Sequence, residues 1–416
     1  SGALARGFAT YGVVIATPKP ADARLPTPGD AALIDLAHAA HKKAHDAALW
    51  LAAQRYGRAP QRVYFTGNSE GGRAALAMAQ RYPADFDGIF ARAPLVQWTG
   101  LQHARWRAGI AQMDGGWLRP AQVRWWADSV RLACDKLDGL GDGIVAAQDG
   151  CGHVFRADLL RCPDGAPAGD WCLGDAQLQA VQALLGPYVF DFDLANGLRS
   201  HPGWTLGGED APPAGAAGGW LAWWSGLQPP TQPPNVENGL GWQHGSAAIA
   251  QWVVRDARFD LRRYDPRQFA ERVRRVSALM DATDPDLAAF AARGGKLLML
   301  EPMADQARSP QAGIDYFAAL VDRLGAAVVD RFARLYLAYG VDHVGHGAPA
   351  SVDMLEVMVD WVEQGSAPDV LDVVQQRLAP PHETLRARPL CRWPMFPRYR
   401  GEGDPALAVS FACASR

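Results

Sequence analysis

The chain has 416 residues, of which 49% are apolar and 20% charged, and its formal net charge is only −3. A chain of this length and composition can bury a large core, which excludes disorder as its main state. Acidic and basic residues are interspersed without a Lys/Arg run, which argues against nucleic acid and against a membrane surface as partners. There is no apolar stretch of about 18 residues and no signal-peptide layout at the start, so we expect a soluble, already processed chain.

Short apolar runs alternate with helical patterns along the chain, which predicts an α/β protein with a parallel sheet. The run YGVVIAT (11–17) is typical of a buried strand, and a helix is expected over residues 30–57, ending at a glycine. The run RVYFTG (62–67) predicts a second strand, followed by a glycine-rich bend and a helix over residues 71–83. Further buried strands are expected in FDGIFARAP (86–94), GGKLLMLEP (294–302) and RFARLYLAYG (331–340).

The α/β rhythm fails between about residues 96 and 285, where Gly, Pro and Trp are abundant. Twelve of the 15 tryptophans of the chain lie there, among them Trp223, Trp224 and Trp242. A long insertion above an α/β sheet commonly covers the site, with packing inside the insertion as the alternative role for any one tryptophan. We therefore predict a catalytic core formed by residues 1–95 and 286–416, with a lid domain over residues 96–285.

The bend FTGNSEGG (65–72) places Ser69 in a GxSxG motif between a predicted strand and a predicted helix. On such a sharp turn a serine exposes its Oγ, and the glycines allow the close backbone contacts that the turn requires. The backbone N–H of Glu70, at the start of the helix, can stabilise an oxyanion. This context favours a nucleophile over a serine that merely fills a turn.

A serine nucleophile needs a histidine base that is oriented by a carboxylate, and in α/β-hydrolases these follow in the order Ser, Asp or Glu, His. Asp305 comes just past one predicted strand and His343 just past the next, as this order requires. Asp342 and His346 are the nearest competitors. A capping carboxylate and a loop histidine are the structural alternatives for Asp305 and His343.

Two other groups of polar residues could bind a metal. His38, His41 and His45 lie near one helical face, but no acidic or cysteine ligand accompanies them at metal spacing, which favours surface or packing roles. Asp135, Asp138 and Asp142 recur in the glycine-containing loop CDKLDGLGDGI (134–144), which suits either an oxygen-liking cation such as calcium or a solvated acidic loop.

The six cysteines form three couples that are close in sequence: Cys134 with Cys151, Cys162 with Cys172, and Cys391 with Cys413. None of these spacings is a CxxC motif, and sequence alone does not fix the pairing. Local disulfides in an oxidising compartment are the favoured interpretation, with free buried thiols as the alternative.

Taken together, these stretches resemble the tannase/feruloyl esterase family, which includes an aromatic-monoester hydrolase. The similarity covers nearly the whole chain and is most specific in YFTGNSEGGRAALAMAQRYPADFDGIFARAP, CDKLDGLGDGI, DATDPDLAAFAARGGKLL, DWVEQGSAPD and the C-terminal RPLCRWP and YRGEGDPALAVSFAC. The resemblance implies an α/β-hydrolase core with an inserted lid and a triad of Ser69, Asp305 and His343. It also implies structural calcium held by side chains of Asp135, Asp138 and Asp142 and by the carbonyls of Leu140 and Ile144, and it implies the three local disulfides.

The sequence departs from this family at two places. Members usually carry a disulfide between a cysteine directly before the serine and one directly after the histidine, whereas Asn68 and Val344 stand at these positions here. The joint absence of both cysteines favours His343 over His346. The family's second oxyanion donor comes from a segment preceding the residues matched here, so only the Glu70 N–H is assigned.

The resulting prediction is a secreted or periplasmic serine esterase that cleaves small esters of aromatic (feruloyl, galloyl or terephthalate-like) acids through an acyl-enzyme. Trp223, Trp224 and Trp242 are the predicted wall of the aromatic pocket, and Arg255 or Arg258 are candidate partners for a substrate carboxylate. The alternatives are an esterase for aliphatic or polyester-derived substrates and a non-catalytic binding protein on the same fold. Neither nucleic acid nor a membrane is an expected partner, and the sequence leaves the oligomeric state open.

Overall fold

The computed structural model describes residues 2–15, 29–164, 169–210, 218–377 and 379–415. Their central feature is a parallel sheet of four strands in the order β1-β2-β5-β6. Its strands are β1 (Tyr64–Asn68), β2 (Gly88–Arg92), β5 (Lys296–Pro302) and β6 (Ala333–Ala338). In the part of the chain that is described, no helix is long and apolar enough to cross a membrane.

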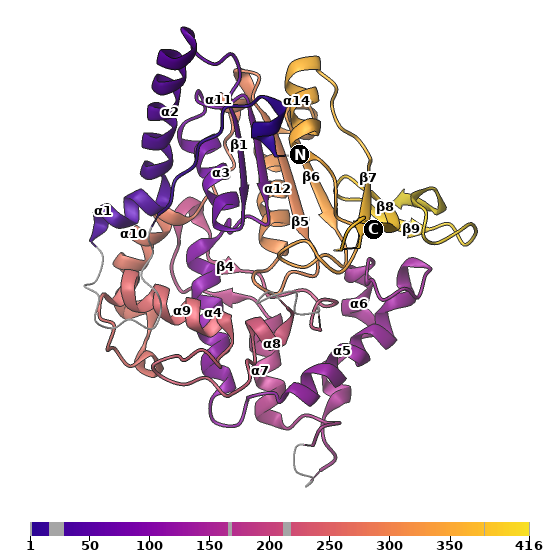
Figure 1. The fold of residues 1–416 in the computed structure, drawn as a ribbon. Coiled ribbons are helices and arrows are strands. Elements are labelled where there is room, and N and C mark those ends of the chain that lie inside the picture. The colour runs from indigo at the N-terminus through magenta and orange to yellow at the C-terminus, as the bar shows by residue number, and fades with distance from the viewer. Residues whose placement is uncertain (1, 16–28, 165–168, 211–217, 378, 416) are drawn as a thin grey trace.

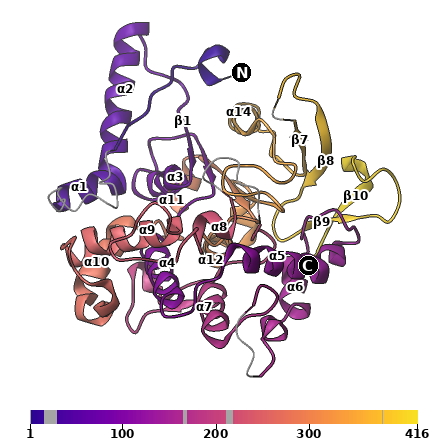
Figure 2. The ribbon, with the colours of Figure 1, turned by 60° about the horizontal axis from the view of Figure 1, so that its bottom comes forward.

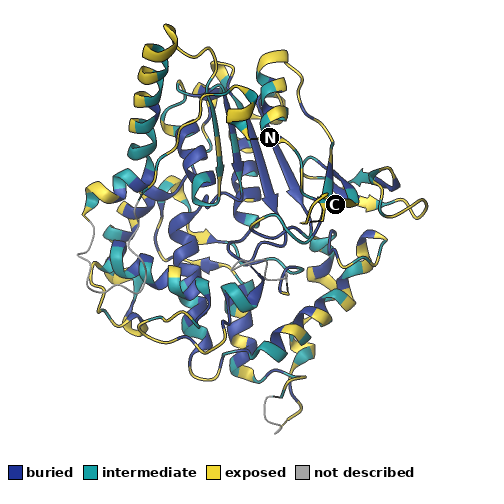
Figure 3. Ribbon diagram, in the orientation of Figure 1, coloured by how far each residue is buried: buried dark blue, intermediate teal, exposed yellow. Residues whose placement is uncertain are grey.

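The two strands β5 and β6 form the centre of the hydrophobic core. Every residue of β6 and all but the first of β5 are buried, as the dark strands of Figure 3 show. Such continuous apolar runs are expected where helices cover both faces of a parallel sheet, and a fully buried leucine contributes about 1.5–3 kcal/mol to stability. The core helices are α3 (Glu70–Arg81), α11 (Ala288–Ala292), α12 (Gln311–Leu324), α13 (Ala326–Val329) and α14 (Met354–Gln364).

The N-terminal part confirms one prediction and corrects another. The expected helix is present as α1 (Asp30–Ile34), a π-helical turn η2 (Asp35–Ala39) and α2 (Ala40–Tyr56), and Gly57 ends it in a left-handed conformation at φ 71°. The strand expected over residues 11–17 was wrong for residues 11–15, which form no helix or strand, and residues 16–17 lie outside the described part. Val14 is 98% exposed and pairs with no strand, and strand propensity without a pairing partner does not make a strand.

The described residues of 96–285 fold into helices joined by loops and lie below the carboxyl ends of the sheet strands in Figure 1. The elements of this inserted segment are α4 (Trp98–Gln112), α5 (Pro120–Cys134), η3 (Asp135–Asp138), α6 (Gln148–Val154), η4 (Ala157–Leu160), α7 (Asp175–Leu185), β3 (Tyr188–Val189), η5 (Ala195–Gly197), β4 (Ser200–His201), α8 (Trp220–Trp223), α9 (Leu240–Ala248), the π-helical η6 (Ile249–Val254), η7 (Leu261–Arg263), η8 (Pro266–Phe269) and α10 (Ala270–Met280).

The two ends of the inserted segment are joined to each other. The N–H of Ala282 donates to the carbonyl of Val96 at 2.9 Å, and the N–H of Thr99 donates to Asp281 Oδ1 at 2.7 Å. The segment therefore leaves the sheet and rejoins it at neighbouring points.

The inserted segment also contains most of a second cluster of buried apolar residues. Leu33 and Leu36 of the N-terminal helix belong to this second cluster rather than to the core around the sheet.

The C-terminal part adds two antiparallel pairs of strands that the sequence did not predict. They are β7 (Leu371–Gln376) with β8 (Thr384–Leu390), and β9 (Phe396–Tyr399) with β10 (Phe411–Ala414). Figure 2 shows them together at one side of the molecule, beyond α14. The predicted disulfides are confirmed: Cys134–Cys151 and Cys162–Cys172 lie in the inserted segment, and Cys391–Cys413 links the C-terminal strands.

Candidate active site

Ser69 occupies a sharp turn between β1 and α3. Its backbone has φ 59° and ψ −117°, a conformation that a residue with a side chain adopts only under strain. A Cβ on Gly67 would lie 2.0 Å from the carbonyl oxygen of Gly71, so the turn closes only because Gly67 lacks a side chain. The predicted strand–turn–helix context of the GxSxG motif is therefore present.

Three side chains from three different strand ends meet at this turn. His343, after β6, places Nε2 3.0 Å from Ser69 Oγ, and its Nδ1 lies 2.7 Å from Oδ2 of Asp305, after β5. Asp305 is fully buried and His343 is 9% exposed. The carboxyl ends of parallel strands meet at one edge of the sheet, which brings together residues separated by 274 positions in the chain.

Asp305 is held as a carboxylate by its surroundings. Burial by itself opposes ionisation, but the imidazole of His343, the guanidinium of Arg308 and the N–H of Ala307 outweigh it and keep the pKa of Asp305 below its ordinary value. The N–H groups of Ala307 and Arg308 donate to Oδ1 at 2.8 and 3.3 Å, which leaves Oδ2 for His343. Arg308 also pairs with the buried Glu301.

Asp342 and His346, the competitors for the acid and the base, have other positions. Asp342 Oδ1 accepts the N–H groups of Val344, Gly345 and His346 at 2.8–3.0 Å, so this carboxylate shapes the loop that carries His343. His346 is in neither of the two hydrogen bonds that link Ser69, His343 and Asp305. The arrangement favours Asp305 and His343, as the order of the motifs predicts.

Glu70 begins helix α3 directly after Ser69. The first N–H groups of a helix have no partner within the helix, and they carry the positive end of its dipole. The side chain of Glu70 is engaged elsewhere, because its Oε1 accepts from Nε of Arg73 at 2.5 Å. The backbone N–H of Glu70 is therefore the first N–H of α3 and directly follows Ser69, and its role as an oxyanion donor stays a prediction.

An aromatic wall from the inserted segment adjoins His343. The ring of Trp223 lies 5.9 Å from the His343 ring in an edge-to-face arrangement and stacks on His244 at 6.1 Å. A small cavity beside it includes Trp204, Trp223, Trp224, Trp242, Gln306 and Ala307 in its lining. Of the three predicted pocket tryptophans, Trp223 is the one whose ring packs against His343; Trp242 is 1% exposed, and its indole N–H donates to the carbonyl of Thr231.

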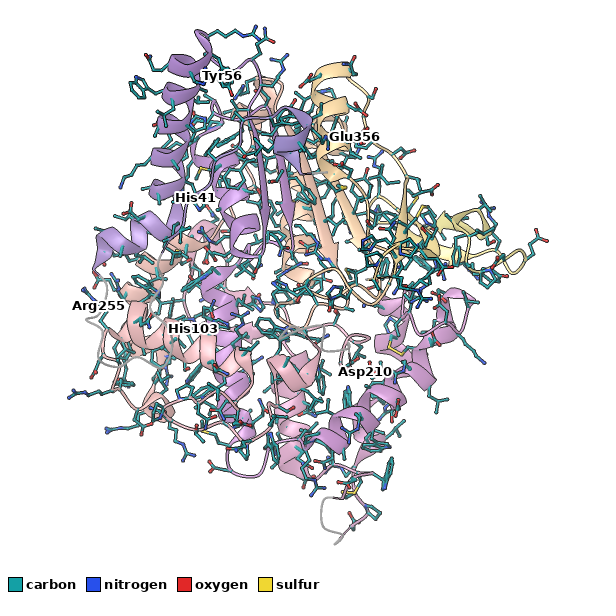
Figure 4. The ribbon with its side chains drawn as sticks, in the orientation of Figure 1. His41, Tyr56, His103, Asp210, Arg255 and Glu356 are labelled. Carbon is teal, nitrogen blue, oxygen red and sulfur yellow. A yellow bond between two sulfur atoms is a disulfide. The ribbon has the colours of Figure 1, made fainter. Side chains whose placement is uncertain are left out.

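The two predicted carboxylate partners lie on the outside of the molecule. Arg255 and Arg258 are exposed at the end of η6, and Figure 4 shows Arg255 at the outer edge of the inserted segment. The structure does not bring them to Ser69. Their selection from sequence relied only on their position within the insertion.

Arg105 of α4 contacts the site and was not singled out from the sequence. Its guanidinium lies 5.6 Å from the Trp223 ring centre and donates to the carbonyl of Ala307 at 2.6 Å. Burial lowers its pKa to about 10, against the opposing charges of Asp305 and Glu70, so it remains a cation at neutral pH. Its helix shows no motif that distinguishes it from the neighbouring Arg107.

The acidic loop lies at the junction with the C-terminal strands. Asp138 is 4% exposed, and burial together with the charges of Asp142 and Asp135 raises its pKa to about 7. Asp135 Oδ1 accepts the N–H groups of Asp142 and Gly143. Asp142 pairs with Arg388 at 2.6 Å, which is a contact that the sequence did not indicate.

Of the three histidines singled out from the sequence, His45 has acidic neighbours, contrary to expectation, whereas His38 contacts Tyr82 and His41 packs on Phe65. One ligand atom each of His45, Asp46 and Asp85 lies within 4.8 Å of the others. However, Lys42 Nζ already lies 2.6 Å from Asp46 and 3.0 Å from Asp85, and His45 packs on the ring of Phe86. Lys42 therefore already pairs with both carboxylates of this cluster and offsets part of their charge.

Comparisons with known proteins identify the family of this chain. The chain matches the sequence profile of the family "Tannase and feruloyl esterase" over residues 1–414. It is 31% identical to an uncharacterised esterase of Agrobacterium fabrum (99% of this chain, 74% of that protein) and 31% identical to the mono(2-hydroxyethyl) terephthalate hydrolase of Piscinibacter sakaiensis (92% and 69%). It is also 32% identical to a probable feruloyl esterase of Arthroderma benhamiae, over 84% of this chain and 63% of that protein. The chain therefore spans 63–74% of the length of these relatives.

Solved structures with the same fold include feruloyl esterase B from Aspergillus oryzae, with a TM-score of 0.79 at 22% identity over 93% of this chain and 75% of that one. Tannin acyl hydrolase from Aspergillus niger gives a TM-score of 0.72 at 21% identity over 94% and 72%. At 21–22% identity, the similarity to these solved structures establishes only the fold. Membership of the family rests on the family profile and on the relatives that are 31–32% identical. The chain belongs to the tannase and feruloyl esterase family of carboxylic ester hydrolases.

Proposed function

We propose that this chain is a serine esterase that hydrolyses esters of aromatic acids through an acyl-enzyme. The observation that carries the proposal is the chain of two hydrogen bonds from Ser69 Oγ through His343 to the buried Asp305, at 3.0 and 2.7 Å. Hydrogen-bond reach between nucleophile, base and orienting carboxylate is the geometric requirement for this chemistry. The names of the relatives, which include feruloyl esterases and a terephthalate monoester hydrolase, support the same substrate class.

In the proposed reaction His343 Nε2 takes the proton of Ser69 as Oγ attacks the ester carbonyl. The Glu70 N–H donates to the oxyanion of the tetrahedral intermediate, and His343 then passes its proton to the departing alcohol. Water, deprotonated by the same nitrogen, attacks the acyl carbonyl, and the bond to Ser69 Oγ breaks as His343 returns the proton to Oγ, which releases the acid and restores the free enzyme. Asp305 stays ionised throughout, since its partners hold its pKa low, and it stabilises the imidazolium.

The inserted segment is proposed to act as a lid domain over a core formed by residues 1–95 and 286–416. Trp223 adjoins His343, and the cavity beside it is lined by aromatic rings, which suits a planar acyl group. The disulfides support a secreted or periplasmic location, because such bonds persist in oxidising compartments.

Hydrolysis of a matched panel of feruloyl, galloyl, terephthalate-monoester and short aliphatic esters tests the substrate class. We expect the highest kcat/KM with the aromatic acyl groups. Equal or faster hydrolysis of the aliphatic esters would instead favour the broader esterase. Tight binding of aromatic esters without turnover would favour a non-catalytic binding protein.

Replacing Trp223 by Ala should raise KM for a feruloyl ester by roughly 3- to 10-fold, because an aromatic contact of about 0.5–1.5 kcal/mol is lost along with buried area. KM for an acetyl ester should change much less. Steady-state kinetics on the two esters measures the difference. Trp171→Ala, a change at a 76% exposed position of the same segment, is the control and should leave both KM values unaltered.

We also propose that the acidic loop binds structural calcium. Its carboxylates fit a hard cation, because Asp138 is buried close to Asp142 and Asp135, whose negative charges disfavour its ionisation unless a cation compensates. Side chains of Asp135, Asp138 and Asp142 and carbonyls of Leu140 and Ile144 would hold the ion. Bound there, calcium would neutralise the carboxylates and stabilise the junction with the C-terminal strands.

A strong chelator should therefore lower the melting temperature. At a calcium concentration 100 times Kd the ion contributes about 2.7 kcal/mol, which corresponds to a shift of several degrees. Asp138→Asn should already melt lower and should no longer respond to the chelator, whereas Asp158→Asn, at an exposed position, should respond like the wild type. A melting temperature unchanged by chelation in the wild type would refute the site.

The family resemblance adds one further expectation at the triad. Relatives are expected to join the two loops that carry the serine and the histidine by a disulfide, where this chain has Asn68 and Val344. All six cysteines are used in the three local disulfides, so none remains to join these loops. We propose that this chain holds the two loops together without a covalent link.

A further inference from the structure

Arg92 is the last residue of β2, and its backbone supports the serine turn. It pairs in register with Asn68, the last residue of β1, and its carbonyl accepts the N–H of Ser69 at 3.0 Å. A Cβ on Gly72 would lie 2.6 Å from the same carbonyl oxygen, so the first turn of α3 packs directly on Arg92. The backbone of Arg92 is therefore fixed relative to Ser69.

The side chain of Arg92 reaches the loop that carries the histidine. Nη1 donates to Asn68 Oδ1 at 2.8 Å and to the carbonyl of His343 itself at 2.7 Å, while Nη2 points to the carbonyl of Asp342 at 3.3 Å. The loop turns over the guanidinium at Gly345, where a Cβ would lie 3.4 Å from Nη2. One planar group thus connects the residue before Ser69 with His343.

The contact of Arg92 with Asn68 and His343 connects two loops that lie far apart in the sheet. In the order β1-β2-β5-β6 the strands that carry Ser69 and His343 are at opposite edges, with two strands between them. The acid and base loops are joined by backbone bonds, since the N–H of Ala304 donates to the carbonyl of Val341 at 3.0 Å. Among the described residues, no backbone hydrogen bond joins the serine turn to the base loop, and Arg92 makes the connection from the intervening strand β2.

We propose that Arg92 is a positioning residue that aligns Ser69 with His343 by clamping the serine turn to the carbonyls of the base loop. The proposal rests on the serine esterase function proposed above. It assigns to Arg92 no contact with the reacting atoms. Its effect follows from geometry, because a displacement of about 1 Å between nucleophile and base can slow a reaction roughly 100-fold. A lysine also has three N–H donors, but they sit on one nitrogen at the end of a flexible stem, so it lacks the planar fork with which Arg92 reaches its three acceptors from two nitrogens.

Arg92→Ala, Arg92→Lys and Asn68→Ala are compared in steady-state hydrolysis of a nitrophenyl acyl ester and in thermal melts. We expect kcat of Arg92→Ala to fall by roughly 10- to 100-fold with little change in KM, because alignment rather than binding is lost. Arg92→Lys should lie between Arg92→Ala and the wild type. The double variant Asn68→Ala/Arg92→Ala should be no slower than Arg92→Ala alone, since both changes break the same link.

Arg293→Ala is the matched control. Arg293 donates to the carbonyl of Phe86 and pairs with Asp87, before the opposite end of β2, so its loss should cost stability without touching the site. Its kcat should stay within about twofold of the wild type.

Two outcomes would overturn the clamp. One is an Arg92→Ala or Arg92→Lys enzyme with wild-type kcat. The other is a loss of kcat in Arg293→Ala as large as that in Arg92→Ala, which would indicate general destabilisation. Ser69→Ala is measured beside them: if it is inactive while the Arg92 variants are normal, the clamp fails and the esterase function stands, whereas full activity of Ser69→Ala refutes the function itself.

Discussion

Replacing Ser69 by Ala should lower kcat for an aromatic ester by about 10⁴-fold or more, because the nucleophile that forms the acyl-enzyme is removed. Ala keeps the turn and introduces no new polar group, so the melting temperature should change little. Stopped assays with a feruloyl ester measure the loss of kcat, and thermal melts measure the melting temperature. Mass spectrometry should trap an acyl-enzyme with the wild type and not with Ser69→Ala.

The control for Ser69→Ala is Ser246→Ala. It removes another serine hydroxyl, which is buried in α9 and donates to the carbonyl of Trp242. Its kcat should remain close to that of the wild type. Turnover by Ser69→Ala at the wild-type rate, in protein free of other esterases, is the result that would exclude the serine mechanism.

Replacing Asp305 by Asn should lower kcat by roughly 10⁴-fold, although the change keeps nearly the same shape. A carboxylate oxygen accepts the Nδ1–H of His343, but the amide nitrogen of Asn donates a hydrogen and selects the tautomer in which Nε2 is protonated. Nε2 then cannot take the proton from Ser69. Kinetics across a range of pH, with folding checked by circular dichroism, would establish the loss.

Asp281→Asn is the matched control, because Asp281 is also buried and also accepts a backbone N–H, from Thr99, but lies outside the triad. Its kcat should stay within about twofold of the wild type. Equal losses in the two variants would mean that burial of a carboxylate, and not its contact with His343, explains the effect.

The two carboxylates also differ in the sign of their effect on stability. The pKa of folded Asp305 lies below its ordinary value, so its ionised form stabilises the fold at neutral pH, and this contribution is lost only as pH falls through the lowered pKa. Burial raises the pKa of Asp281 to about 6, so its ionisation destabilises the fold as pH rises between 3.8 and about 6. Melts at several pH values would separate the two.

The contacts of the candidate triad were predictable because its three side chains each follow a buried strand. Ser69, Asp305 and His343 each follow a short apolar run, and parallel strands bring such positions to one edge, so order and spacing sufficed. The disulfide couples were predictable because each pair is close in sequence. The apolar run at residues 11–15 shows the limit, since the same local pattern formed no strand without a neighbour to pair with.

Arg92 and Arg105 were not predictable for a different reason. Both donate to backbone carbonyls, at His343 and Ala307, which every residue possesses and no motif marks. Their partners lie 251 and 202 positions away in the chain. For the same reason the sequence could mark the insertion as tryptophan-rich but could not select Trp223, whose ring packs against His343, from eleven others in the segment.

The joined ends of the inserted segment have an evolutionary consequence. Because the Ala282–Val96 and Thr99–Asp281 bonds close the segment at its base, changes in its length or contents need not alter the spacing of β2 and β5. Under the proposed lid function, the insertion can then change without moving Ser69, His343 and Asp305 relative to one another. If the insertion forms the acyl pocket, as proposed, swapping residues 97–281 between relatives should alter the substrate preference.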